Sequence, residues 1–486
     1  MRRGYYYNFG KPEPVSSKPE PKDSQISSPS DIIEKDFRGG IIDQHKKIEM
    51  YLFTLFDKAM LPREYTSPAP IKSGTTMLEE VHRYIKRKDA NGELVNKVRA
   101  YISAAVPSLE KEYLSQSKFF KIRYTTTGTN SVPGDDTNRN GIPDYVEAVA
   151  AAFENAKAVT CGQRGFKTPI LDSGKPSMDI NLYDLNGKYG ITFPQKSYTK
   201  DNGLRLTSSS ISIDNNYSSQ KGFKEASLDC MKVTAAHEFF HAVQNSYNAD
   251  SDSWWKEASA TWNEDEVYDG VNDYLQYLGK YMSSPGMPLD QTSYSGVIFV
   301  KFISEYWGGY ETVKSIWDTQ AKRYRNSVNA IDTAIKSKYR IEDLGSIYNR
   351  FTACNYNPSQ YYKEGYLWNT TVALQDTIEK YPSEGIKGTL SHLSSNYTLF
   401  KAGNSAKTLK VQVQGTSGTQ WGFKVVKRRS SDKKCEAVSI PFDSRTNTSE
   451  FICEGFGSTY NEVCLVCSNL DKTSDGGVYT VKASVE

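Results

Sequence analysis

Two histidines and a glutamate at residues 237 to 241 have the spacing of a catalytic metal site. The stretch reads "HEFFH", with His237 and His241 four residues apart and Glu238 beside the first. On an α-helix such a pair lies on one face, so both imidazoles can bind one ion. Zinc held by neutral imidazoles keeps a position for water, and an adjacent carboxylate can take that water's proton. The pattern predicts His237 and His241 as zinc ligands and Glu238 as general base; the alternative is a buried helix with two packed imidazoles.

A catalytic zinc needs a third protein ligand. The metzincin pattern would require glycine and histidine where this chain has Gln244 and Tyr247. Downstream, "SWWKEASATWNEDEVYDG" follows the turn-like "NADSDS" and predicts a second helix from about Trp254, with Glu257 in its first turn. A short reversal and an antiparallel second helix would bring Glu257 back over the ion bound by His241, which makes Glu257 the predicted third ligand.

An acidic run follows on the same predicted helix. Glu264 lies seven residues after Glu257, so two turns later it faces the same way and could orient a ligand histidine. The alternative for Glu264, Asp265 and Glu266 is a solvated helix face.

These motifs resemble a known class of enzymes. "HEFFHAVQ" followed by "WWKEASATWNEDEV" is similar to the gluzincin zinc metalloproteases, and most of all to a family of secreted, mostly bacterial metalloproteases. The resemblance covers roughly residues 115 to 310, including "FFKIRYTTTGTNSV", "MDINLYDLNGKYGITF" and "SSISIDNNY". It implies the same three ligands and the same base. Two features depart from thermolysin-like enzymes: the interval to Glu257 is shorter, and Thr261 stands in place of an aspartate.

The resemblance implies two further parts of the site. In gluzincins, substrate lies extended along a sheet edge before the active-site helix, here "SSSISIDNN" at 208 to 216. A tyrosine or histidine commonly donates to the developing oxyanion, and Tyr294 in "SYSGVIFVKFISEYWGG" is the candidate. With 33 tyrosines in the chain, a packing role for Tyr294 is the alternative. The motif G-x-M-E-N of clan aminopeptidases is absent, which favours an endopeptidase.

A second constellation has the spacing of an EF-hand-type calcium loop. The stretch "DTNRNGIPDYVE" spans residues 136 to 147, with Gly141 at the sharp turn and a predicted helix after it. A strand and turn precede the loop instead of an entering helix. The alternative is an Asx-rich surface turn without an ion. The predicted calcium ligands, with Ile142 acting through its carbonyl, are Asp136, Asn138, Asn140, Ile142, Asp144 and Glu147.

The remaining chain must position these motifs. We expect an α+β fold: a gluzincin-like metalloprotease domain with a mixed sheet and helices, and a carboxy-terminal all-β sandwich. Residues 1–40 are rich in Pro, Ser and Lys, which predicts a flexible leader. The pattern at 41–116 predicts amphipathic helices, and this segment is a candidate prodomain. The protease domain is expected at 117–385 and the sandwich at 386–486.

Composition limits the setting. The net charge is +3, which gives no reason to expect a nucleic-acid partner, and no apolar run approaches the roughly twenty residues of a membrane helix. The amino terminus has no apolar signal-peptide core. Secretion is nevertheless expected from the calcium loop, from four glycosylation sequons, and from Cys464 and Cys467, which on a strand would face opposite ways and could pair with Cys435 or Cys453.

The sequence thus predicts a secreted zinc-dependent endopeptidase that acts on protein or peptide substrates and is stabilised by calcium. Zinc would polarise the scissile carbonyl, and Glu238 would carry a proton from water to the leaving amine. A zinc aminopeptidase is one alternative. The other is a calcium-stabilised adhesion or binding protein derived from a protease, in which the sandwich binds a surface ligand.

Overall fold

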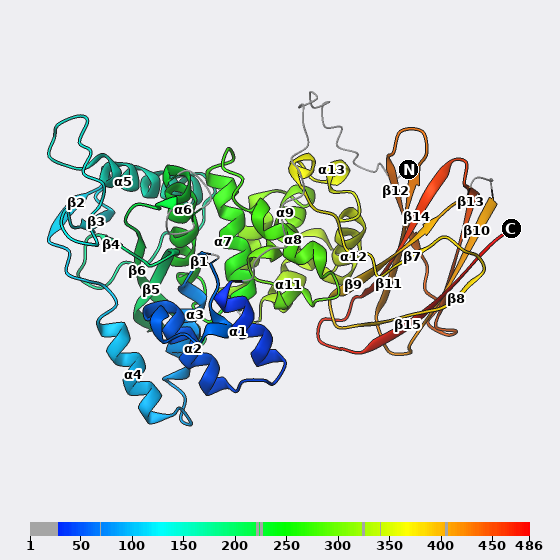
Figure 1. Ribbon diagram of the computed structural model, residues 1–486, viewed down its shortest axis with the longest axis horizontal. Coiled ribbons are helices and arrows are strands. Elements are labelled where there is room, and N and C mark those ends of the chain that lie inside the picture. Colours follow the sequence, from blue (N-terminus) through cyan, green and yellow to red (C-terminus); the bar gives the residue numbers. More distant parts are fainter. Residues whose placement is uncertain are drawn as a thin grey trace.

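The computed structural model describes residues 28–486, apart from 69, 220–222, 224–226, 323–325, 341 and 404–406. It confirms a mixture of helices and sheets with a sheet-rich carboxy-terminal region. Three large hydrophobic clusters underlie it: one among the amino-terminal helices, one in the central region and one within the carboxy-terminal strands. In Figure 1 the amino-terminal helices (blue) lie below the central region, and the carboxy-terminal strands lie at the right-hand end. Among the described residues, no helix is long and apolar enough to cross a membrane.

Four helices form the amino-terminal part: α1 (Pro29–Arg38), α2 (Gln44–Phe56), α3 (Thr75–Tyr84) and α4 (Gly92–Ser103). A side-chain cap begins α1, α2 and α4, from Ser28, Asp43 and Asn91 respectively. The helical prediction for 41–116 is therefore confirmed for α2, α3 and α4. The predicted flexible leader at 1–40 ends too late, because α1 lies within it. Residues 1–27 are outside the described residues.

The central sheet has six strands in the order β1-β5-β6-β4-β3-β2. Two of them lie before the predicted domain boundary at 116, so the amino-terminal segment is part of this sheet as well as a helical layer. Side chains of β3 alternate between buried and half-buried, as the period of a strand requires. The strands are β1 (Ile71–Ser73), β2 (Lys111–Leu114), β3 (Phe120–Tyr124), β4 (Met178–Tyr183), β5 (Lys188–Thr199) and β6 (Arg205–Asp214).

The strand expected to form the substrate edge is not an edge. β6 pairs antiparallel with β5 on one side, and with β4 in parallel on the other. At 211–214 both rows of its backbone hydrogen-bonding groups are engaged, so this part of β6 cannot accept another strand. β5 lies one position further out, and on its outer side it pairs in parallel with β1, where Ile71 is opposite Lys188 and Ser73 opposite Gly190.

Helices of the central region cover this sheet and continue towards the carboxy-terminal strands. The helix predicted to carry His237 and His241 and the second helix predicted from about Trp254 are confirmed as α6 and α7, and α6 is buried on nearly all sides. The helices are α5 (Asp144–Lys157), α6 (Ser227–Asn245), α7 (Ser253–Val267), α8 (Leu275–Ser283), α9 (Val297–Tyr306), α10 (Tyr310–Gln320), α11 (Ser327–Tyr339), α12 (Leu344–Cys354) and α13 (Pro358–Tyr361).

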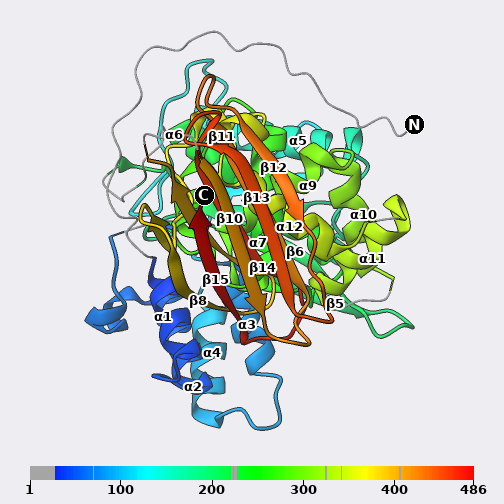
Figure 2. The same ribbon diagram turned by 90° about the vertical axis from the view of Figure 1, so that its right-hand side faces the viewer.

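The carboxy-terminal strands form two layers, and in Figure 2 the broad faces of these strands are turned towards the viewer. One layer follows the pairings β7-β9-β14-β11-β12 and the other β13-β10-β15-β8; between them β13 and β14 share a single residue pair. The predicted boundary at 386 falls inside β8, so this region begins earlier than expected. Its strands are β7 (Asp376–Ile378), β8 (Ser383–Leu390), β9 (Ser394–Lys401), β10 (Lys407–Gly415), β11 (Trp421–Arg429), β12 (Cys435–Ile440), β13 (Thr448–Phe456), β14 (Tyr460–Asn469) and β15 (Gly477–Val485).

The cysteines of this region do not pair. Cys464 packs towards the central helices and Cys467 into the core of the carboxy-terminal strands, so the two thiols do face opposite ways. All seven cysteines lie within the described residues and are free thiols. The expected disulfide with Cys435 or Cys453 is therefore wrong for this structure; all four side chains instead serve as small buried apolar groups.

Candidate metal centre

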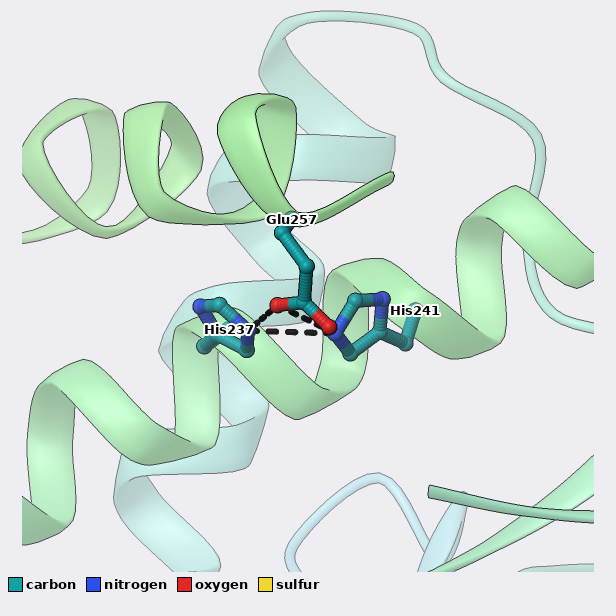
Figure 3. Close-up of side chains that lie close together, drawn as sticks. All are labelled: His237, His241 and Glu257. Carbon is teal, nitrogen blue, oxygen red and sulfur yellow. Dashed lines mark hydrogen bonds and ion pairs between the residues drawn. The ribbon is translucent and has the colours of Figure 1, made fainter. Parts of the chain in front are cut away.

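Three predicted ligands meet between helices α6 and α7. The Nε2 atoms of His237 and His241 are 3.1 Å apart, and Glu257 Oε2 lies 3.1 Å from the first and 3.6 Å from the second. Figure 3 shows the carboxylate reaching down from α7 between the two rings on α6. All three side chains are at most 1 % exposed. They form a group that could hold a metal ion.

The helix pair explains why the ligands converge. His237 and His241 lie one turn apart on α6, and α7 begins at Ser253, so Glu257 lies just beyond the first turn in which it was predicted. Gln244 links the two helices, because its amide donates to the Lys256 carbonyl on α7 at 2.8 Å.

The outer nitrogen of each histidine is bound by a neighbour. His237 Nδ1 lies 2.7 Å from Glu264 Oε1, and His241 Nδ1 lies 2.8 Å from Gln244 Oε1. Both partners are acceptors, so each Nδ1 carries the proton and donates. In the neutral imidazoles, the two Nε2 lone pairs then point at each other and at a carboxylate oxygen. Such an arrangement of acceptors is repulsive in a buried site and is relieved by a cation.

Glu264 is held in turn by a buried lysine. Lys72 Nζ lies 2.8 Å from Glu264 Oε2 and 2.7 Å from Asp273 Oδ2, with all three side chains almost completely buried. Burial by itself lowers the pKa of Lys72, but the attraction of Asp273 and Glu264 outweighs it and raises the pKa, so the lysine stays charged. The predicted contact between Glu264 and His237 is confirmed, and the solvated alternative is excluded for Glu264.

The acidic neighbours also affect the protonation of His237. Burial lowers the pKa of this imidazole, yet the hydrogen bonds and charges of Glu257 and Glu264 raise it overall to about 9. In the metal-free chain a proton on Nε2 therefore takes the place where a cation would bind. The pKa of Glu257 is lowered by the two histidines in spite of its burial.

The side chain of Glu238, the predicted base, lies on the face of α6 that packs against the sheet. Its Oε2 accepts hydrogen bonds from the hydroxyls of Thr75 at 2.8 Å and Thr192 at 2.7 Å. Its Oε1 is buried and has no hydrogen-bond partner among the described residues. Gly190 makes room for this side chain, because a Cβ there would lie 2.6 Å from Glu238 Cγ. One carboxylate oxygen thus remains available for a water or a reacting group.

Tyr294, the predicted oxyanion donor, lies against the centre. Its ring centroid is 6.0 Å from that of His237, and the residue is half-buried. The hydroxyl donates to the Ser73 carbonyl and accepts from the Ser73 N–H, each at 3.1 Å. It therefore already binds a backbone peptide group, although the peptide belongs to β1.

The predicted calcium loop is compact and lies on the surface. Gly141 has a φ of +84°, as the sharp turn requires, and the loop ends in the first turn of α5. Both carboxylate oxygens of Glu147 accept side-chain amides, from Asn138 and Asn140 at 2.8 Å each. Asp136 accepts the N–H groups of Asn140 and Gly141, and Asp144 accepts from Thr137. Four predicted ligands converge, whereas Asp144 turns towards the loop backbone.

Several other polar residues serve packing. The Thr261 hydroxyl donates to the Glu257 carbonyl within α7, so this hydroxyl does not take over the role of the aspartate that Thr261 replaces.

A second acidic group, Asp265, Asp269 and Glu364, could hold a metal by geometry. Lys301 already lies 2.7 Å from Asp265 and 3.0 Å from Glu364, so a buried ammonium supplies the cation there.

Sequence reasoning missed the partners that surround the ligands. Gln244 carried a usable signal, since it lies three residues after His241 on the same helix. The sequence gives no such signal for three other partners, because their elements are far from α6 and α7 in the chain: Lys72, Thr75 and Thr192.

Comparisons with known proteins add no functional information. No family model matches the chain, and no curated protein matches it. Similar solved structures include the pre-peptidase C-terminal domain of a collagenase from Bacillus anthracis, 17% identical, and a periplasmic inhibitor of g-type lysozyme from Salmonella Typhimurium, 12% identical. Each match covers 24% of this chain and 100% of the other, with TM-scores of 0.19 and 0.17. A family GH115 4-O-methyl-α-glucuronidase is 9% identical over 52% of this chain and 39% of its own, with a TM-score of 0.14. At these TM-scores none of the three carries an argument.

Proposed function

We propose that the chain is a zinc-dependent peptidase with its active site between α6 and α7. The spacing of the three ligand atoms carries this proposal. A tetrahedral zinc with bonds of about 2.0–2.1 Å holds its ligand atoms about 3.3–3.4 Å apart. The separations here are 3.1, 3.1 and 3.6 Å, between one carboxylate oxygen and two imidazole nitrogens whose lone pairs face the site when the rings are neutral. This donor set suits zinc better than calcium or magnesium, which prefer shells of oxygen.

Bound zinc would supply a Lewis acid for a carbonyl oxygen and would lower the pKa of a bound water. The residues of the chain provide the rest. Glu238, one position after a ligand, accepts the proton from water on its free Oε1 and donates it to the leaving amine. Tyr294 can donate a hydrogen bond to the oxyanion from beside His237. Glu264 and Gln244 fix the two histidines in the tautomer that binds the ion.

The substrate class and the setting remain as the sequence predicts them. The gluzincin assignment rests on the sequence resemblance and on the helix pair that presents His237, His241 and Glu257. We extend the proposal to an endopeptidase that acts outside the cell on protein or peptide substrates. The carboxy-terminal strands are the candidate for binding a surface ligand.

Calcium is proposed as a structural ion in the loop at 136–147. Four predicted ligands already converge there: Asp136, Asn138, Asn140 and Glu147. Bound calcium would take the place of the N–H groups that now donate to their oxygen atoms.

Metal content tests the function. The purified chain is expected to hold about one zinc per molecule after equilibration with zinc, and His241→Ala to hold none, by elemental analysis. His82→Ala is the matched control, because His82 belongs to α3 and contacts none of the three ligands; it should keep its zinc. Failure of the wild type to take up zinc would overturn the proposal. A zinc-loaded chain without hydrolytic activity in any form would favour the binding-protein alternative.

A further inference from the structure

Residues 71–76 lie where a peptide substrate would have to bind. Without β1, the outer edge of the central sheet would be β5, with a free row of N–H and C=O groups beside the metal centre. Such an edge binds an extended peptide as an added strand. In this structure β1 occupies it, and the Gly74 N–H also donates to the Gly190 carbonyl at 2.9 Å.

The same short segment contacts three groups of the proposed active site. The backbone of Ser73 takes both hydrogen bonds of the Tyr294 hydroxyl. The Thr75 hydroxyl donates to Glu238 at 2.8 Å, and the Thr76 hydroxyl donates to Glu257 Oε1 at 2.7 Å. Backbone N–H and C=O groups of the chain itself thus meet the oxyanion donor, while the base and one ligand are bound by hydroxyls.

The segment is anchored from both ends. Lys72 supplies the charge between Glu264 and Asp273, and Glu79 on α3 contacts the fully buried Lys256 beside Glu257. Apolar side chains of α2, α3 and α4 form one hydrophobic cluster with Ile191 and Phe193 of β5. These contacts leave His237, Glu238 and His241 fully buried. A cleft of about 640 Å³ opens nearby between α4 and the sheet, but none of these three residues lines it.

We propose that the outer edge of β5 is the binding surface for an extended polypeptide substrate, and that residues 71–76 occupy it and close the metal centre until they are displaced. This inference rests on the proposed function, since it assigns the substrate edge and the control of the same site. The substrate is expected to bind as an extended strand, because this surface consists only of the backbone groups of β5 and the site residues. The competing interpretation is that residues 71–76 are a permanent part of the active site.

Gly74 provides a small change that separates these interpretations in the intact chain. A Cβ at Gly74 would lie 2.7 Å from Ile191 Cγ1 on β5 and 2.8 Å from Leu55 Cδ2 on α2, closer than carbon atoms pack. Gly74→Ala should therefore push the segment off the edge of β5. Gly92→Ala is the matched control, because it adds the same methyl group in the same part of the chain, at the start of α4, with nothing within 4 Å.

Two measurements on the zinc-loaded proteins then report opening. The first is the rate at which 1,10-phenanthroline removes zinc, and the second is the hydrolysis of fluorescently labelled casein. Gly74→Ala should raise both rates by about tenfold or more over wild type and Gly92→Ala, with zinc content unchanged. Unchanged removal of zinc, or lower hydrolysis with zinc retained, would overturn the inference and make the segment a permanent part of the site.

A cut chain provides a second test if Gly74→Ala does not fold. A recognition sequence for a site-specific protease is inserted in the exposed turn at 86–89, between α3 and α4, and for comparison in the exposed loop at 416–418, between β10 and β11. Cleavage at 86–89 alone should accelerate zinc removal and hydrolysis. Faster zinc removal without hydrolysis would support the closing role of residues 71–76 and refute the peptidase. No zinc in any form would refute the proposed function itself, and equal effects of the two cuts would overturn the inference.

Discussion

The metal centre and the calcium loop are both built from polar side chains at fixed spacing, yet they differ in what they require. In the metal centre, two lone pairs and a carboxylate oxygen face one another in a site with no access to water. In the loop, the side-chain oxygens accept N–H groups of the loop itself and remain on the surface. Burial therefore makes the first site depend on a cation, or on a proton in its place, whereas the second is stable without an ion.

The largest expected effect concerns Glu238 Oε1, which has no hydrogen-bond partner among the described residues. Glu238→Gln keeps the shape and the bonds to the threonines but removes the base. We expect hydrolysis by the opened chain to fall about a thousandfold, in the range for loss of a general base, with zinc content unchanged. Initial rates with labelled casein test this expectation. A loss of zinc together with activity would instead show that Glu238 holds the centre together.

Lys72 tests how much the buried surroundings of the metal centre contribute to stability. Lys72→Ala leaves Glu264 and Asp273 buried without their shared cation, which should lower the free energy of unfolding by about 3–5 kcal/mol. Lys88→Ala, an exposed lysine beyond α3, should change it by less than about 0.5 kcal/mol. Urea denaturation measures both values. Equal, small changes would mean that water reaches the two carboxylates and that the centre is less closed than described.

The dependence of stability on pH should distinguish the metal-free from the zinc-loaded centre. The pKa of His237 is raised from its ordinary value of 6.5 to about 9. In the metal-free chain this stabilisation is fully present below pH 6.5 and is lost as the pH rises towards about 9. Zinc takes the place of that proton, so the zinc-loaded chain should lose less stability over this interval. Urea denaturation at pH 6 and pH 9, with zinc or with chelator, checks the expectation; parallel losses would contradict it.

The smallest effect is expected at the calcium loop. If calcium binds with a dissociation constant of about 0.1–1 mM, as in extracellular modules, 10 mM calcium should stabilise the chain by about 1–3 kcal/mol. Glu147→Gln removes the charge that closes the loop and should abolish this gain. Thermal unfolding with calcium or magnesium, in zinc-loaded protein, measures it. Equal stabilisation of the variant would place any calcium elsewhere.

The sequence by itself determined the local constellations of this protein. The histidines of α6, the return of Glu257 on α7, the turn at Gly141 and the alternation along β3 all depend on residues within one element or across one short connection. Helix and strand periods fix these relations whatever the rest of the fold does. The position of Glu264 followed from the same period, although only the structure showed that it is buried and bonded to His237.

Only the tertiary structure decided what covers the metal centre. Lys72 and Asp273 are separated by 201 residues, and Thr75 and Glu238 by 163. No local pattern predicts such contacts, because they follow from which strand pairs at a sheet edge and which charges are buried together. For the same reason β6 was mistaken for the substrate edge, and the sheet was expected to begin after residue 116. Periodicity predicts that a strand exists, but its neighbours are chosen by packing across the whole chain.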